Sequence, residues 1–280
     1  MRTVADLEFR RDLYRGTAAD YDRYRLPYPG DLIEYVIRDT RPADSGGGAL
    51  LDLACGTGQA AFALAAWFGE VWAVDQEPDM IALARRKARA WPPGRFRFVA
   101  SAAENLSAPD GKFELITIGN AFHRLPRHAV AERSFRWLRP GGHLALLWGG
   151  TPWDGPEPWQ RAVAATMRRW RRRVGPDDRI PAGYERDRRD TPDAAILRAA
   201  GFEPAGARQF PVRSQWTSRE LAGFAYSTSV LSRAVLGSAA AEFEADLRRE
   251  LLVSETSGRV SQTLWFAAEL AVRPQAARTR

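Results

Sequence analysis

The sequence predicts an α/β fold in which helices cover both faces of a doubly wound, mostly parallel sheet. Two observations lead to this prediction. Apolar, strand-like runs alternate with helical segments between residues 49 and 149, which is the pattern of consecutive βαβ units. The first run ends in a glycine-rich turn, as expected where a buried strand leads into a helix. With 280 residues, the chain is long enough for one large domain.

Hydrophobic periodicity assigns the elements in order. In the first half, strands are expected at 49–54, 71–75, 95–100, 113–119 and 143–149, and helices at 59–68, 77–90 and 129–138. Pro78 stands at the start of the second helix, where its missing N–H costs little. In the second half, helices are expected at 158–173, 191–202, 217–234 and 238–253, and strands at 207–216 and 258–272.

The alternation of strands and helices stops after Gly150, where the run "TPWDGPEPW" is rich in proline, glycine and tryptophan. The whole chain, 1–280, is therefore expected to form a single domain with an interruption. Its expected parts are an N-terminal lid with helices at 1–40, a ligand-binding core at 48–150, an inserted helical segment at 151–190 and the C-terminal part of the sheet at 191–270.

Charge and composition exclude several classes of protein. The net charge is +7, but residues 161–190 alone hold ten arginines against five acidic residues, which fits a solvated surface better than a nucleic-acid site. The single cysteine, Cys55, excludes an intrachain disulfide. No apolar run reaches membrane-spanning length, and no secretory signal is evident. We expect a cytoplasmic protein without membrane or nucleic-acid partners, and leave a homo-oligomer open.

The glycine-rich turn predicts the kind of ligand. Gly56-x-Gly58-x-x-Ala61 has the spacing of a dinucleotide-binding loop. Asp52 precedes the loop, and its carboxylate would repel a pyrophosphate but attract an ammonium or sulfonium group. Asp75 ends the next strand, where it can accept hydrogen bonds from both hydroxyls of an adenosine ribose. The pattern therefore favours a cationic adenosine ligand over NAD.

At this point the chain resembles the class I S-adenosylmethionine-dependent methyltransferases over about residues 10–270. The segments that carry the resemblance are "LLDLACGTG", "VWAVDQEPDMIALA" and "FRWLRPGGHLALLW". It implies a Rossmann-like, seven-stranded sheet, S-adenosyl-L-methionine as cofactor with S-adenosyl-L-homocysteine as product, and no metal. The cofactor-binding residues that we expect from the loop and from the resemblance together are Asp52, Ala54, Gly56, Gly58, Asp75, Gln76, Met80, Ala103, Glu104 and Asn120.

Two of these assignments, the recognition of the adenine and the role of Met80, have an alternative interpretation. Many relatives have an acid where Ala102 stands, so recognition of the adenine would fall to Glu104 or to backbone groups. Met80 fits simple helix packing equally well.

The catalytic residues expected from the same resemblance are Tyr14, Phe122 and His123. Phe122 and His123 leave the strand that should carry the methyl group toward its acceptor. A histidine there could take a proton from an amine or hydroxyl, although a packing role is equally compatible. Arg124 follows where small-molecule members often have tryptophan.

The N-terminal run "YRGTAADYDRYRLPYP" resembles a segment of antibiotic-tailoring N-methyltransferases, such as those that act on lincosamides. Tyr21, Tyr24, Arg25 and Tyr28 would form one aromatic helix face, either packed in the core or closing as a lid over the cofactor. The resemblance implies methyl transfer to an amine, or a hydroxyl, of a small secondary metabolite.

Three other functions compete with this one. An RNA or protein methyltransferase could use the arginine-rich window, but the base-methylating (D/N)PP(Y/F/W) motif is missing from the sequence after the fourth strand. A protein that binds S-adenosylmethionine without catalysis would need the same loop. The glycine spacing also fits an NAD-dependent oxidoreductase, but the carboxylate of Asp52 would repel the pyrophosphate of NAD.

Overall fold

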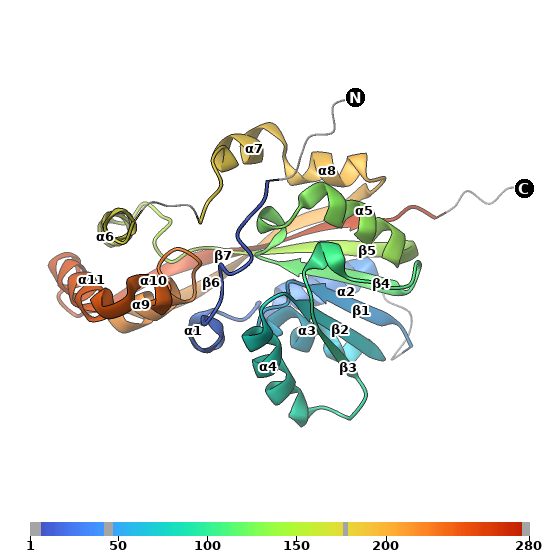
Figure 1. Cartoon of the computed structure of the whole chain (residues 1–280), viewed down its shortest axis with the longest axis horizontal. Helices are drawn as coiled ribbons and strands as arrows, with labels where there is room; N and C mark the ends of the chain where they lie inside the picture. Colours follow the sequence, from blue (N-terminus) through green and yellow to red (C-terminus); the bar gives the residue numbers. More distant parts are fainter. Residues whose placement is uncertain (1–6, 42–46, 176–178, 276–280) are drawn as a thin grey trace, which may run out of the picture.

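A computed structural model describes residues 7–41, 47–175 and 179–275. Its centre is one sheet of seven strands in the order β3-β2-β1-β4-β5-β7-β6. Strands β1 to β5 are parallel, whereas β7 runs antiparallel to both β5 and β6 (Figure 1). The strands are β1 Ala49–Leu53, β2 Glu70–Asp75, β3 Phe96–Ala100, β4 Phe113–Gly119, β5 Leu138–Gly149, β6 Glu203–Thr217 and β7 Arg259–Val272.

Helices surround the sheet, and they agree with most of the expected segments. They are α1 Ala18–Tyr24, α2 Gly30–Thr40, α3 Gln59–Leu64, α4 Pro78–Lys87, α5 Arg127–Trp137, α6 Pro158–Arg173, α7 Tyr184–Asp190, α8 Asp193–Ala199, α9 Ser218–Tyr226, α10 Arg233–Leu236 and α11 Ala240–Ser254. Short 3₁₀ turns, η3 Ala103–Asn105 and η4 Phe122–Arg124, follow β3 and β4.

Strand β1 shows why the sheet is covered on both faces. All five of its residues are buried, as expected for a parallel strand between two layers of helices. Leu50 belongs to the apolar cluster that includes α2 and α3, whereas Leu51 and Leu53 belong to the cluster that includes α5. This alternation follows from the two-residue period of a strand. It confirms the α/β class with a doubly wound, mostly parallel sheet.

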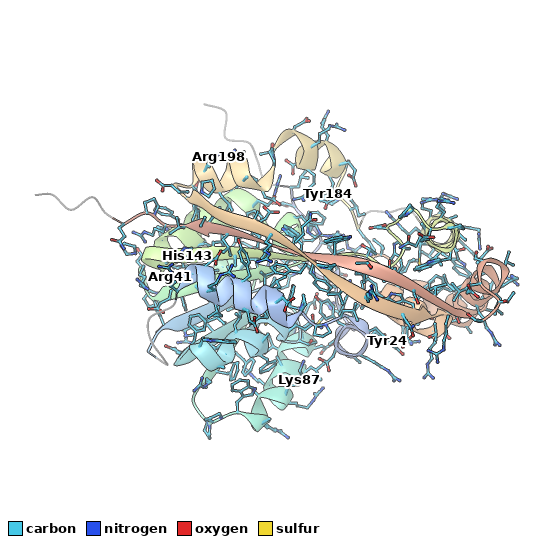
Figure 2. All side chains as sticks on the ribbon, turned by 180° about the vertical axis from the view of Figure 1, so that it is seen from behind. Tyr24, Arg41, Lys87, His143, Tyr184 and Arg198 are labelled. Atoms are coloured by element: carbon cyan, nitrogen blue, oxygen red, sulfur yellow. The ribbon has the colours of Figure 1, made fainter. Side chains whose placement is uncertain are left out.

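Strands β6 and β7 form a long antiparallel pair that continues beyond the parallel part of the sheet. Figure 2 shows the two strands from behind, running from the core to the helical region that α6, α9 and α11 form at the far end. There Trp170 of α6 packs edge-on against Phe243 of α11, with ring centroids 5.7 Å apart. Arg169 and Arg173 of the arginine-rich window form ion pairs with acids of α11.

Two helical segments differ from the prediction. The helix expected at 217–234 is interrupted because the hydroxyls of Ser227 and Thr228 donate to the α9 carbonyls of Phe224 and Ala225, at 2.6 and 2.7 Å. Helix α7 was not predicted, since its charged sequence has no apolar period. No helix among the described residues is long and apolar enough to cross a membrane.

Candidate active site

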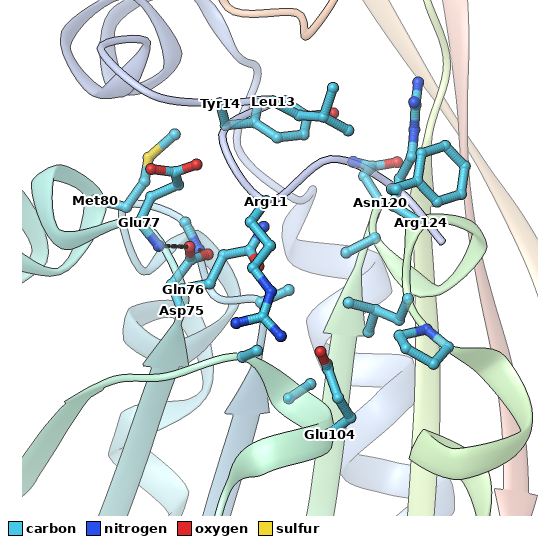
Figure 3. A pocket seen from close by; sticks show the side chains of 18 of the residues that line it. Arg11, Leu13, Tyr14, Asp75, Gln76, Glu77, Met80, Glu104, Asn120 and Arg124 are labelled. Carbon is cyan, nitrogen blue, oxygen red and sulfur yellow. Dashed lines mark hydrogen bonds between the residues drawn. The ribbon is translucent and has the colours of Figure 1, made fainter. Parts of the chain in front are cut away.

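A cavity of about 380 Å³ opens at the carboxyl ends of β1 to β4. This is the edge of an open α/β sheet at which ligands bind. The loops after these four strands form its floor and sides, and the N-terminal segment contributes the remaining wall through residues 7–11, 13 and 14 together with Tyr21 and Arg25 (Figure 3). The N-terminal segment that we expected to act as a lid thus lies against the cavity.

Two ends of the cavity differ in charge. At one end lie Asp75, Gln76, Glu77 and Met80, which follow β2; we call these four residues the acidic end. At the other end Arg124, Leu125 and Pro126 follow β4, together with Phe9 of the N-terminal segment; we call these four the arginine end. Figure 3 shows Arg124 across the cavity from Asp75 and Glu77.

The loop after β1 is held in place by the acidic end. The backbone N–H of Gly56 donates to Asp75 Oδ2 at 2.8 Å, and Asp75 Oδ1 accepts from the N–H of Glu77 at 2.9 Å. Ala54 and Gly56 both have positive φ, 51° and 54°, which turns this backbone toward the cavity. Gly58 also has positive φ, but it does not line the cavity; a Cβ there would lie 2.6 Å from the ring of Phe62.

Asp52 does not have the position that the sequence predicted. It is 1% exposed and does not line the cavity. Its oxygens accept from the hydroxyl of Thr117 at 2.7 Å and from the N–H of Ala61 at 3.0 Å. Burial raises its pKa to about 7, although the two hydrogen bonds act in the opposite direction and lower it. Through these two hydrogen bonds Asp52 fixes the start of α3 against β4.

Asp75 and Glu77 are the acids that face the cavity at the acidic end. Burial raises the pKa of both carboxyl groups, and the charge of Asp75 raises that of Glu77 further. Glu77 is 4% exposed, and its Oε1 has no hydrogen-bond partner among the described residues. A buried carboxylate oxygen without a partner is costly, so a ligand with donors or positive charge would be favoured here. Sequence reasoning missed Glu77, although it stands only two residues after Asp75.

Most of the other expected ligand-binding residues also line the cavity. These are Ala54, Gly56, Gln76, Met80, Ala103, Glu104 and Asn120. Asn120 has positive φ, 51°, and its side-chain oxygen accepts from the N–H of Gly149 at 2.8 Å. Its side chain therefore supports β5, as expected if its backbone is the part that approaches a ligand.

The expected catalytic residues separate into two groups. Tyr14 lines the cavity, but Phe122 and His123 do not. Phe122 is fully buried in the apolar cluster beside α5. His123 packs on the rings of Trp148 and Tyr184, with centroids 5.7 and 6.2 Å away. The η4 turn places Phe122 in the apolar interior and half-buried His123 against two aromatic rings, so neither lines the cavity. Their assignment to the acceptor site stays a prediction.

His123 is also poorly suited to accept a proton. Burial lowers its pKa to about 3, and the positive charges of Arg124, Arg188, Arg127 and Arg25 lower it further in the same direction. From this turn it is Arg124, the neighbouring residue, that lines the cavity. One indication of this role was present in the sequence, since Arg124 stands where small-molecule methyltransferases often have tryptophan.

The N-terminal segment is fastened by residues from distant parts of the chain. Arg179 donates to the carbonyl of Leu13 at 2.9 Å, and also to the carbonyl of Ser229. The rings of Phe9 and Tyr184 meet edge-on at 5.7 Å. Residues of the inserted segment therefore hold the wall of the cavity in place.

Comparisons with known proteins agree with this geometry. Residues 50–142 match a family model described as a methyltransferase domain. The putative type II methyltransferase from Anaeromyxobacter dehalogenans superposes with a TM-score of 0.59 at 22% identity, covering 90% of this chain and 100% of that one. The fold is that of the class I methyltransferases. The cofactor that the sequence predicts for such a fold is S-adenosyl-L-methionine.

Two curated relatives are similar over part of this methyltransferase fold. The chain is 37% identical over 145 residues to the ubiquinone/menaquinone biosynthesis C-methyltransferase of Methylobacterium nodulans, which covers 49% of this chain and 57% of the relative. It is 37% identical over 130 residues to the demethylmenaquinone methyltransferase of Thermus thermophilus, covering 45% and 56%. The chain thus spans little more than half the length of these relatives.

The residues present fit the cofactor. S-adenosyl-L-methionine has two cationic groups and a ribose, and the acidic end offers Asp75 and the unpartnered Glu77 Oε1 to such a ligand. The backbone of Ala54 and Gly56 would approach it without side chains in the way.

Proposed function

We propose that this chain transfers a methyl group from S-adenosyl-L-methionine to a small-molecule acceptor. The observation that carries the proposal is the carboxylate of Asp75, which holds the Gly56 loop and faces the cavity at the strand edge where this fold binds its cofactor. The acidic end would hold the cofactor, and the acceptor would enter from the arginine end.

When bound, the cofactor supplies an electrophilic methyl group. The protein then has mainly to hold a nucleophile in line and to exclude water. Leu13, Tyr14 and Phe9 supply an apolar wall for this purpose. Because His123 does not line the cavity and has a strongly lowered pKa, we propose no histidine base. The acceptor would react through an atom that already carries a free electron pair, or would lose its proton to water.

Two classes of acceptor are supported by different observations. The N-terminal tyrosine-rich run favours an amine or hydroxyl of a secondary metabolite, with an amine preferred. The names of the curated relatives favour a ring carbon of a quinone precursor.

An RNA acceptor is less well supported. Arg169 and Arg173 of the arginine-rich window are already paired with acids of α11 and are therefore not free to bind phosphates. We also propose that the protein is cytoplasmic.

Calorimetric titration tests the cofactor part of the proposal. The wild-type protein should bind S-adenosylmethionine and S-adenosylhomocysteine, and not NAD. Asp75→Asn should weaken S-adenosylmethionine binding about ten-fold or more, because it replaces a charge-assisted contact by a neutral one. Asp79→Asn is the matched control, since Asp79 is exposed on α4 and does not line the cavity. Tight binding of NAD by the wild-type protein would overturn the assignment.

A mass-shift assay tests the transfer itself. The enzyme is incubated with S-adenosylmethionine and either a pool of aminated and hydroxylated metabolites or demethylmenaquinol, and products heavier by one methyl group are sought. Transfer to either acceptor class supports an enzyme and distinguishes the two. Cofactor binding without transfer to any acceptor would favour a non-catalytic binding protein.

A further inference from the structure

Arg124 is unusual among the arginines near the cavity. Its Nε and Nη1 atoms are buried, and neither has a hydrogen-bond partner among the described residues. Its neighbours are fully engaged: Arg127 forms ion pairs with Asp187 and Asp193 at 2.7 and 2.6 Å, and Arg188 pairs with Asp193 at 2.8 Å. Buried N–H groups without an acceptor are unfavourable, so a partner for Nε and Nη1 of Arg124 is the feature that this site lacks.

Aromatic rings hold Arg124 in place without satisfying its N–H groups. The guanidinium carbon lies 5.1 Å from the ring centre of Phe9 and 5.8 Å from that of Tyr184. Such stacking stabilises the charge through the ring faces. It leaves the in-plane N–H groups, which require oxygen acceptors, unsatisfied.

The charge around the cavity favours an anion near Arg124. Asp75 and Glu77 lie at the opposite end, and the remaining acids of the wall are Glu104, after β3, and Glu8, which is exposed. No ion pair joins Arg124 to an acid within the described part of the chain. Arg11 and Arg25 also line the cavity and add positive potential to its wall.

We infer that the acceptor carries a carboxylate, which binds the guanidinium of Arg124 at the arginine end of the cavity. This inference rests on the proposed function, because it assigns a substrate class to the same site. The carboxylate would accept charge-assisted hydrogen bonds from Arg124 and would orient the acceptor with its nucleophilic atom toward the acidic end. Arg124 would thus determine specificity while taking no part in the bond changes.

The test uses a pair of probes that differ only in charge. Fluorine NMR measures binding of para-fluorobenzoate and para-fluorobenzamide to protein saturated with S-adenosylhomocysteine. The wild-type protein should bind the benzoate about ten-fold or more tighter than the benzamide, since a hydrogen bond to a charged group is worth more than a neutral one. Arg124→Gln should abolish the preference, and Arg124→Lys should keep part of it. Arg89→Gln, which changes an exposed arginine outside the wall, should leave it intact.

Several outcomes would overturn the inference. These are equal affinity of the wild-type protein for both probes, no binding of either probe, or a preference that survives in Arg124→Gln. The affinity for S-adenosylhomocysteine, measured for every variant, shows that the cavity is intact. If S-adenosylhomocysteine binds and the preference is absent, this inference alone fails. If S-adenosylhomocysteine does not bind the wild-type protein, the proposed function fails with it.

Discussion

The acidic end and the arginine end of the cavity are assembled in different ways. The acidic end comes from one short segment after β2, and backbone hydrogen bonds to Asp75 tie it to the neighbouring loop after β1. The arginine end combines residues after β4 with Phe9, and it depends on Tyr184 of a distant helix. One end is fixed by local backbone geometry and the other by side chains that are far apart in sequence.

This difference has a functional consequence. A loop whose backbone is held by a single carboxylate suits a ligand that never changes, because its geometry depends on few side chains. A wall made from the N-terminal segment and the inserted segment can vary without disturbing the sheet. We therefore expect substitutions at the acidic end to change cofactor affinity, and substitutions at the arginine end to change acceptor binding and ligand release.

The largest effect is expected for Gly58→Ala beside the acidic end. The φ of Gly58 is 85°, and a Cβ would lie 2.6 Å from the Phe62 ring. Positive φ costs an alanine about 1–2 kcal/mol, and the steric overlap adds about 1–3 kcal/mol. We expect stability, measured by denaturant unfolding, to fall by about 3 kcal/mol, and S-adenosylmethionine affinity to fall about ten-fold as the loop shifts.

Gly94→Ala is the matched control for this variant. Gly94 has the same φ, 85°, but no atom lies within 4 Å of its Cβ position. It should lose only the conformational part, about 1–2 kcal/mol, and keep its cofactor affinity. Equal losses in the two variants would mean that Phe62 moves aside freely and that the loop tolerates a side chain.

The second prediction concerns Asp52→Asn. The folded-state pKa of Asp52, about 7, lies above its ordinary value of 3.8, so its neutral form favours folding. The stability it contributes is full below pH 3.8 and is lost as pH rises through about 7, by about 1.4 kcal/mol per pH unit. Asparagine resembles the neutral form and does not titrate. Relative to the wild-type protein, the variant should therefore gain about 2 kcal/mol between pH 5 and pH 8 in thermal unfolding.

The same variant tests whether Asp52 contributes to cofactor binding at the acidic end. Because Asp52 does not line the cavity, cofactor affinity should change by no more than a few fold. Asp79→Asn should show neither effect, since that carboxylate is exposed. A large loss of S-adenosylmethionine affinity in Asp52→Asn would restore the direct electrostatic role that the sequence predicted.

The acidic end could be predicted from sequence because its geometry is local. A buried strand followed by Gly56-x-Gly58, and a second strand ending in Asp75, constrain the backbone enough to place these residues at one edge of the sheet. What the pattern could not show is which carboxylate is exposed to the cavity. Asp52 is directed into the interior because the hydroxyl of Thr117, 65 residues away, provides its partner.

The arginine end could not be predicted in the same way. Whether Phe122, His123 or Arg124 lines the cavity depends on the direction of one 3₁₀ turn, and sequence periodicity does not determine that direction. The stacking of Arg124 on Tyr184 joins residues 60 positions apart through α7, whose sequence has no apolar period. Tertiary contacts of this kind leave no signal in a single sequence.

The third prediction tests whether the inserted segment holds the N-terminal wall. Arg179→Ala removes the hydrogen bonds to the carbonyls of Leu13 and Ser229. We expect faster hydrogen exchange in residues 7–14 and several-fold faster release of S-adenosylhomocysteine, because each lost hydrogen bond is worth about 1 kcal/mol. Arg186→Ala is the control, since Arg186 is exposed and does not line the cavity. Unchanged exchange and release would mean that the wall stays in place without the inserted segment.

The smallest effect is expected for His123→Phe, a variant that tests whether His123 serves the acceptor. Burial lowers the folded-state pKa to about 3, below the ordinary value of 6.5, so the neutral form favours folding. The stability this contributes is present above pH 6.5 and is lost as pH falls through about 3. Phenylalanine keeps the contacts with Trp148 and Tyr184 but does not titrate. In thermal unfolding, the variant should gain about 1 kcal/mol relative to the wild-type protein on going from pH 7.5 to pH 5.5.

The catalytic readout of the same variant decides between a packing residue and a base. Since a histidine with so low a pKa is neutral throughout the neutral range, it cannot produce a limb in the pH–rate profile there. With an acceptor identified by the mass-shift assay, the wild-type protein and His123→Phe should therefore have profiles of the same shape between pH 6 and pH 8. Loss of a neutral limb in the variant would show that His123 takes the proton, and that η4 must turn when the acceptor binds.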